Sequence, residues 1–230
     1  MDRSDVQETL VSLYLRLNGY FVSGFIVHAP HRTRTEMDAL AVRFPNHQEP
    51  EREVQSCEHL AIPANHIDFI VGEVKGGGSA VNFNSRFREN PAAIRTVLRR
   101  FGAFNETEIT DVVSRVSDVL VPANLKRAPA FPELNLAVFQ SDCGVAKLRF
   151  VPFAPEQSRP DAHARPYVFG DDMMTFVWRC FRPEQQRPMC DDHYNYELWG
   201  PQFTSMVDYF KQPTRHTAGT VADLYQEYGC

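Results

Sequence analysis

The feature that most constrains the chain is one apolar stretch that ends abruptly in charge and glycine. Residues 67–75 read Ile-Asp-Phe-Ile-Val-Gly-Glu-Val-Lys, and three glycines follow at 76–78. The stretch predicts a β-strand, in which alternation places Glu73 and Lys75 on one face and Val74 on the other. An acid and a base at the end of an apolar strand are costly when buried without partners. A divalent cation would satisfy the acid, and water or a phosphate would satisfy the lysine. The glycines leave the backbone open to the close approach of a bulky phosphodiester.

Helical and strand-like patterns around this strand predict a mixed α/β or α+β fold. The first helix is expected over about Asp5–Leu17, because residues 4–7 fit a capping box and apolar residues follow at helical spacing. Residues 45–66 carry prolines and many charges and are expected to form a polar insertion between strands. The other expected elements are strands over 20–28, 36–44, 134–140 and 146–153, and helices over 90–101, 106–120, 170–180 and 201–210.

Composition excludes several classes of protein. With 230 residues, 43% of them hydrophobic, the chain is long enough to bury a sizeable core in one large domain or in one domain with an extension. A net charge of −5 excludes a basic nucleic-acid coat and leaves only a local basic face. No apolar run approaches the roughly 18 residues of a membrane helix. The N-terminus lacks the apolar core of a signal peptide, and the five cysteines include no C-x-x-C pair. We therefore expect no membrane partner and a reduced, cytoplasmic location.

Two further acids give weight to the Glu-x-Lys pattern, which is a weak signal by itself. Asp38 lies within the otherwise apolar segment Glu36–Val42, where an acid needs a physical reason. Glu8 lies in the first turn of the expected N-terminal helix. An alternative interpretation is a buried ion-pair network that holds two strands together, and Glu8 could simply complement the helix dipole. Glu36 has the same strand parity as Asp38 and is either a substitute ligand or a charge at the start of the strand.

These residues and their order resemble the PD-(D/E)XK nucleases, the restriction-endonuclease-like superfamily that includes Mrr-type restriction enzymes and archaeal Holliday-junction resolvases. The resemblance covers roughly residues 4–150. Its matching positions are Glu8, Gly19-Tyr20, the segment 36–42 and the segment 69–75. It implies a restriction-endonuclease-like α/β core over residues 1–153, with a central mixed β-sheet flanked by helices. A mostly helical C-terminal extension over 154–230 would pack on this core or continue it.

The resemblance also implies a chemistry. Asp38 and Glu73 would bind Mg²⁺, with Mn²⁺ able to substitute, and Lys75 would position or activate the attacking water. The Val74 carbonyl and Glu8 would be further ligands. The implied function is metal-dependent hydrolysis of nucleic-acid phosphodiester bonds, with DNA favoured and RNA not excluded, in a defence or repair complex.

The chain departs from the family pattern at several points. Met37 precedes Asp38 where many members have proline, and the gap from Asp38 to Glu73 is longer than a tight hairpin needs. The sequence shows no Q-x-x-x-Y after the Glu-x-Lys strand and no cluster of four cysteines. These absences argue against the RecB-like branch and its iron–sulfur relatives.

A nuclease also needs positive surface near its site. Between residues 75 and 127 there are nine basic residues against five acidic ones, which gives a local charge of +4. Phosphate contacts from such a face would give salt-sensitive affinity with little sequence preference. The alternative is a solvated helix side. The candidate nucleic-acid-binding residues are Arg32, Arg34, Arg86, Arg88, Arg95 and Arg99.

A competing class of function uses the same fold without catalysis. The chain would then be a nucleic-acid-binding or protein-assembly subunit, with the charged residues as a relic. The intact set of Asp38, Glu73 and Lys75 favours the enzyme. Either class leaves room for a homodimer or for a partner protein in a larger complex.

Overall fold

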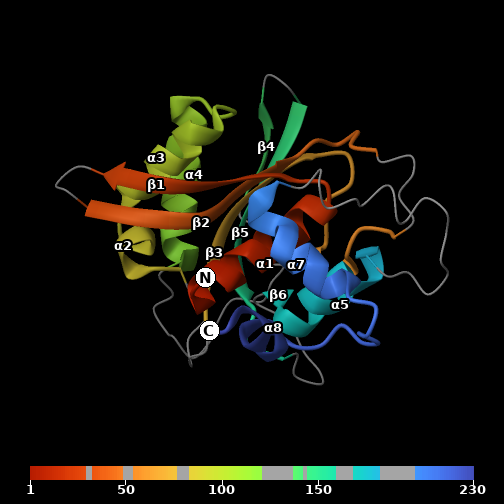
Figure 1. Cartoon of the computed structure of the whole chain (residues 1–230). Coiled ribbons are helices and arrows are strands. Elements are labelled where there is room, and N and C mark those ends of the chain that lie inside the picture. The colour runs from red at the N-terminus through yellow and green to blue at the C-terminus, as the bar shows by residue number, and fades with distance from the viewer. Residues whose placement is uncertain are drawn as a thin grey trace.

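The fold is an α/β arrangement with one six-stranded mixed sheet between two groups of helices (Figure 1). The computed structural model describes residues 1–29, 33–48, 54–76, 83–120, 137–141, 144–158, 168–181 and 200–230. The sheet order is β1-β2-β3-β5-β4, with β6 beside β5. Neighbours are antiparallel except for β3 with β5 and β5 with β6, which are parallel. The strands are β1 (Phe21–Ala29), β2 (Thr33–Arg43), β3 (Ile67–Val74), β4 (Ala137–Ser141), β5 (Gly144–Ala154) and β6 (Val168–Phe169).

The helices cover both faces of the sheet. Figure 1 shows α1, α5, α7 and α8 gathered on one side and α2, α3 and α4 on the other. The side chains of the first group share an apolar cluster with Ile70 of β3, and those of the second group share another with Phe69 and Val71. The helices are α1 (Arg3–Leu17), α2 (Ser85–Arg88), α3 (Pro91–Phe101), α4 (Glu106–Leu120), α5 (Gly170–Phe181), α7 (Pro201–Lys211) and α8 (Val221–Tyr228), with a short 3-10 helix, η2 (Glu58–Leu60).

The central strand β3 is mostly apolar because both of its faces are covered. Alternate side chains enter the two clusters, so a half-polar pattern would leave polar groups buried. The first of its two acids, Asp68, is 1% exposed and is neutralised by Arg149 of β5. Arg149 Nε donates to Asp68 Oδ1 at 2.9 Å, and Nη1 donates to the Leu60 carbonyl at 2.6 Å. The Tyr20 hydroxyl also donates to Asp68, which completes a buried polar network through the sheet.

The mixed α/β class and the sheet flanked by helices are confirmed, and several local expectations are corrected. The first helix begins at Arg3 rather than Asp5, because Asp2 is the N-cap and forms the capping box with Asp5. Glu8 therefore lies in the second turn. Strand β2 begins at Thr33, so Asp38 lies inside the strand instead of near its start. Sequence patterns missed α2, α8 and β6, since each is short.

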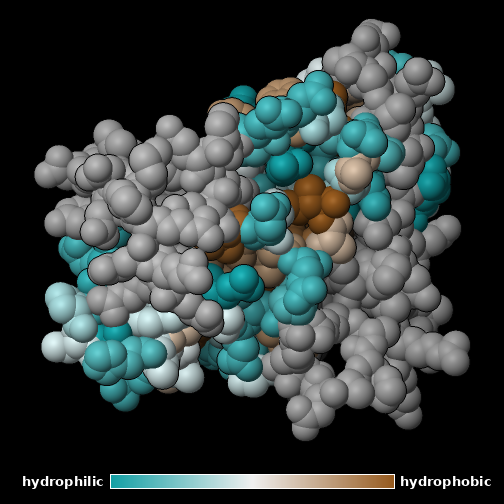
Figure 2. All heavy atoms as spheres, turned by 90° about the vertical axis from the view of Figure 1, so that its right-hand side faces the viewer, coloured by the Kyte–Doolittle hydropathy of each residue, from teal (hydrophilic) through white to brown (hydrophobic). Residues whose placement is uncertain are grey.

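One face of the molecule is mostly polar where it is described. Figure 2, which looks at the right-hand side of Figure 1, shows hydrophilic side chains around a small group of apolar ones. Among the described residues, no helix has both the length and the apolar character needed to cross a membrane.

Candidate active site

The Glu-x-Lys motif lies at the end of β3, where the strand leaves the sheet. The Lys75 backbone N–H donates to the Phe153 carbonyl at 2.9 Å, which keeps the two parallel strands together up to this point. Lys75 Nζ lies 2.5 Å from Glu73 Oε1, and the lysine side chain is 31% exposed whereas that of Glu73 is only 4% exposed. The second oxygen, Glu73 Oε2, is buried and has no hydrogen-bond partner among the residues that the structure describes. The site therefore has an acceptor that is withdrawn from water and receives no direct hydrogen bond from the described residues, although the Asn84 amide acts on the same carboxylate.

A β-bulge directs Asp38 toward the same point. Between the pairs Ser23 with Leu40 and Phe25 with Met37, β2 has two residues, Asp38 and Ala39, against one on β1. Regular pairing of β2 with β3 stops at Ala39. Bulges of this kind re-aim side chains near functional sites. Asp38 Oδ2 accepts a hydrogen bond from the Val74 backbone N–H at 2.6 Å.

The orientation of Val74 follows from this contact. The N–H and C=O of one residue in a strand point to the same edge, so the Val74 carbonyl also faces the Asp38 side of β3. The Asp38 carboxylate and the Val74 carbonyl thus lie where β2 and β3 separate, and the Glu73 carboxylate is within electrostatic range of Asp38.

Burial shapes the electrostatics of all three acids. It raises the pKa of Asp38 to about 6; the Val74 N–H opposes this shift and the Glu73 carboxylate adds to it. Burial also raises the pKa of Glu73, against the lowering effects of Lys75 and of the Asn84 backbone amide. Burial and then the charge of Asp38 raise the pKa of Glu8. Glu8 is therefore within electrostatic range of Asp38, although its Oε1 accepts a hydrogen bond from Ser4 at 3.2 Å.

The donor set fits a hard divalent cation with few protein ligands. Oxygen ligands suit Mg²⁺, which keeps several waters and commonly takes one or two protein carboxylates. The unsatisfied Glu73 Oε2 is the observation that supports this fit. No group of three His, Cys, Asp or Glu side chains that could hold a metal occurs in the described part of the chain. A cation here would thus rely on Asp38, Glu73 and the Val74 carbonyl, with Glu8 outside the immediate group.

A polar contact from the C-terminal helix lies beside the motif. A Cβ atom on Gly76 would be only 3.2 Å from Gln7 Nε2 of α1. Gln7 donates to Glu156 Oε1 at 3.0 Å and to the Tyr225 hydroxyl at 2.5 Å, and Tyr225 donates to Glu156 at 2.8 Å. Sequence reasoning missed these three residues because no local pattern links them. Gly77 and Gly78 lie outside the described residues.

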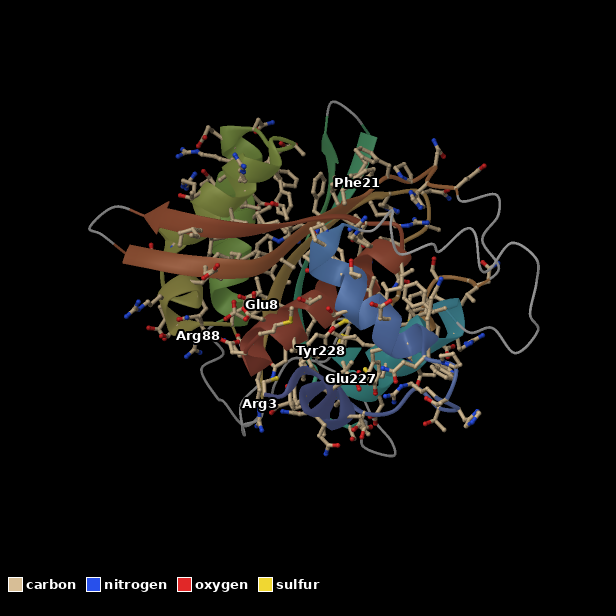
Figure 3. The ribbon with its side chains drawn as sticks, viewed as in Figure 1. Arg3, Glu8, Phe21, Arg88, Glu227 and Tyr228 are labelled. Atoms are coloured by element: carbon tan, nitrogen blue, oxygen red, sulfur yellow. The ribbon has the colours of Figure 1, made fainter. Side chains whose placement is uncertain are left out.

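The predicted basic residues are dispersed. Arg32 lies outside the described residues, as does the side chain of Arg34, whose backbone belongs to β2. Arg86 is exposed on α2, and Arg88 Nη2 lies 3.4 Å from Glu89. In Figure 3, Glu8 on α1 and Arg88 on α2 both lie in the lower left part of the molecule.

Two of the predicted arginines form ion pairs between α3 and α4. Arg95 and Arg99 contact Glu106 at 3.4 and 2.7 Å. Exposed ion pairs of this kind contribute little to stability, so a phosphate could displace the acid.

Comparison with known proteins adds no assignment: no family model, curated protein or solved structure matches the chain.

Proposed function

We propose that the chain is a metal-dependent nuclease of the PD-(D/E)XK type that hydrolyses phosphodiester bonds, with DNA as the favoured substrate. The observation that carries this proposal is the meeting of Asp38, Glu73 and Lys75 at the end of β3, with Glu73 Oε2 buried and unsatisfied. A defence or repair role belongs to the same proposal and rests on the family resemblance.

Each residue has a distinct part in this mechanism. Asp38, Glu73 and the Val74 carbonyl would hold Mg²⁺. When bound, Mg²⁺ would lower the pKa of a water molecule that it binds and would polarise a phosphate oxygen. Lys75 is partly exposed, so its ammonium group can orient a water and offset negative charge that grows on the phosphate. Its hydrogen bond to Glu73 fixes the position of Nζ beside the carboxylates.

A second candidate is favoured by the same ion pair. Because Lys75 neutralises one oxygen of Glu73, the two side chains could serve only to join strand ends in a non-catalytic binding subunit. This candidate predicts neither metal affinity nor cleavage.

The test is a cleavage assay with Mg²⁺ and with Mn²⁺ on supercoiled, linear, single-stranded and branched DNA and on RNA. Lys75→Ala is compared with Lys211→Ala, which removes the same charge from α7. We expect cutting by the wild type and by Lys211→Ala, and loss of at least a hundredfold in Lys75→Ala. Equal cutting by all three proteins would point to a contaminant or a different site. No cutting of any substrate would contradict the proposal.

A further inference from the structure

Gln7 carries a buried amide on the apolar side of α1. The residue is 5% exposed, and it precedes Leu10 and Tyr14 by three and seven positions, so the three side chains share one side of the helix. Leu10 and Tyr14 are fully buried. Burying an amide costs free energy that an apolar side chain of the same size would not cost. Packing alone therefore does not account for a glutamine at this position.

The amide is held by two residues from distant parts of the chain. Gln7 Nε2 donates to Glu156, which follows β5, and to the hydroxyl of Tyr225 on α8. The Tyr225 hydroxyl donates in turn to the same oxygen, Glu156 Oε1. The three hydrogen bonds close a triangle, and both donor hydrogens of the amide are used in it. The end of the Gln7 side chain is therefore fixed in place.

Tyr225 is itself well anchored. It is 6% exposed, and the Arg3 guanidinium of α1 lies over its ring, 5.0 Å from the centroid. A capping box of Thr220 and Asp223 fixes the start of α8. Figure 1 shows α8 beside the first part of α1. The hydroxyl that accepts from Gln7 is thus carried by a helix with a defined start and a defined place.

The held amide lies against the backbone at the end of the candidate motif. A Cβ atom on Gly76 would be 3.2 Å from Gln7 Nε2 and 3.3 Å from Gln7 Oε1. Because these two distances are nearly equal, a face of the amide group, rather than one end of it, borders Gly76. Both distances are shorter than an ordinary van der Waals contact, so a side chain at position 76 would force a shift. Gln7 therefore limits how far the backbone can approach α1 where the chain leaves β3.

Gln7 and the Lys75 side chain lie on opposite sides of the sheet. Val74 packs against the apolar cluster that includes residues of α1, and alternation along the strand places Glu73 and Lys75 on the other side. Gln7 can therefore act on the Lys75 side chain only through the backbone of residues 75 and 76. At that point the Lys75 N–H is bonded to the Phe153 carbonyl at 2.9 Å. The strand end is thus bonded to β5 and bordered by the amide of Gln7.

We propose that Gln7 is a positioning residue for Lys75 and that Tyr225 and Glu156 hold it in place. The inference rests on the proposed nuclease function, in which Lys75 orients the attacking water. The amide keeps the backbone at Gly76 from moving toward α1, and so keeps the Lys75 ammonium beside Glu73. The flexible stem of a lysine passes a shift of its backbone on to Nζ. A misplacement of about 1 Å at a reacting group can cost on the order of a hundredfold in rate.

The first measurement needs neither metal nor substrate. NMR of the full chain follows hydrogen exchange of the Lys75 N–H, which reports on the bond to Phe153. In Gln7→Ala we expect this amide to exchange faster by about tenfold or more, while amides in the middle of β3 keep their rates. Gln226→Ala, which removes an exposed glutamine from α8, should leave the exchange of Lys75 unchanged. A glutamine that served only to attach α8 would alter exchange in α8 and leave Lys75 as in the wild type.

Cleavage kinetics then test the effect on the reaction. In Gln7→Ala we expect kcat to fall by about tenfold or more and KM to stay within about threefold, because Lys75 acts on the water after the substrate has bound. Tyr225→Phe removes a single oxygen atom and should lower kcat by a smaller factor. Tyr228→Phe makes the same change on the same helix (Figure 3) and should leave kcat unchanged. Circular dichroism checks that each variant is folded.

A double variant tests whether Gly76 transmits the effect. Gly76→Ala alone should lower kcat, because its Cβ would meet the held amide at 3.2 Å. In the Gln7→Ala background the same Cβ enters the space that the amide has left. The double variant should therefore cut faster than Gln7→Ala alone, by about threefold or more, so that the two effects are coupled.

Three results would overturn this inference while leaving the proposed nuclease intact. They are unchanged exchange of the Lys75 N–H in Gln7→Ala, a wild-type kcat in Gln7→Ala, and a double variant in which the two losses simply multiply. If Gln7→Ala does not fold, Tyr225→Phe takes its place in the first two measurements, with the same result overturning the inference. A wild type that cuts no substrate is a different outcome, because it overturns the proposed function and the role of Gln7 with it.

Discussion

Asp38 and Val74 join two strands at the point where their regular pairing has ended. Asp38 Oδ2 accepts a hydrogen bond from the Val74 N–H at 2.6 Å, and Val74 lies between Glu73 and Lys75 in the sequence. A side chain thus takes the place of the next ladder hydrogen bond. The contact fixes a carboxylate beside the Glu-x-Lys motif at the cost of burying an acid, and this cost can be measured.

Replacing Asp38 by Asn is expected to stabilise the protein at neutral pH. Because burial raises the pKa of Asp38 to about 6 from an ordinary 3.8, the folded state binds more protons than the unfolded state between these values. The contribution of Asp38 to stability is therefore most favourable below pH 3.8 and is lost as pH rises through about 6. The Asn side-chain oxygen can still accept from Val74. We expect a gain of about 1–2 kcal/mol at pH 7.5 and little gain at pH 4, measured by urea unfolding.

Asp111→Asn is the matched control, because Asp111 is exposed on α4 and pairs with Arg115 at 3.1 Å. It should show no comparable gain. If Asp38→Asn gains the same stability at pH 4 and at pH 7.5, the gain does not come from removing a buried ionised carboxylate, and the prediction is wrong.

Glu73→Gln is expected to weaken Mn²⁺ binding at least tenfold in calorimetry with the metal alone. The change removes a negative charge beside the unsatisfied Oε2 while keeping the size of the side chain. Proton release on binding should be larger at pH 6 than at pH 8, because a bound cation favours the charged form of Asp38, whose pKa is about 6. Glu106→Gln, at an exposed ion pair with Arg99, serves as the control. Identical affinities in the wild type and Glu73→Gln would remove this residue from the metal site.

Arg149→Met is expected to destabilise the fold by about 3–5 kcal/mol, because it leaves the buried Asp68 carboxylate without its cation. Urea unfolding at pH 7 measures the loss. Adding Asp68→Leu to this variant should recover part of the stability, since it removes the isolated charge. If the double variant is instead less stable than Arg149→Met, by as much as a separate core substitution would cost, the unpaired charge of Asp68 is not the cause of the loss of stability.

The end of β3 was predictable because its signal is local: an apolar run, an alternating acid and base, and glycine within a dozen residues. The position of Asp38 could be predicted only in part. The sequence indicated an acid in an apolar strand, but the bulge that directs it depends on the register with β1. The contacts of Gln7 with Glu156 and Tyr225 span 149 and 218 residues, and the contact of Arg149 with Asp68 spans 81. Such contacts arise from strand order and helix packing, which single residues do not encode.

Arg86 is the predicted phosphate contact with the best-defined place beside the site. It follows Asn84, whose backbone amide acts on Glu73 and whose side chain accepts from the Arg86 N–H at 3.0 Å. The Arg86 side chain is exposed, so in the proposed nuclease it is available to a phosphate of bound DNA.

Arg86→Gln should therefore lower DNA affinity by a similar factor for unrelated sequences, because phosphate contacts carry no sequence information. The slope of log affinity against log salt should become shallower by about one. Binding is measured in Ca²⁺, with the wild type checked for absence of cleavage, and Arg115→Gln on α4 is the matched loss of charge. An unchanged slope, or an equal loss of affinity in Arg115→Gln, would show that Arg86 does not contact the nucleic acid and that the charge of the whole chain governs binding.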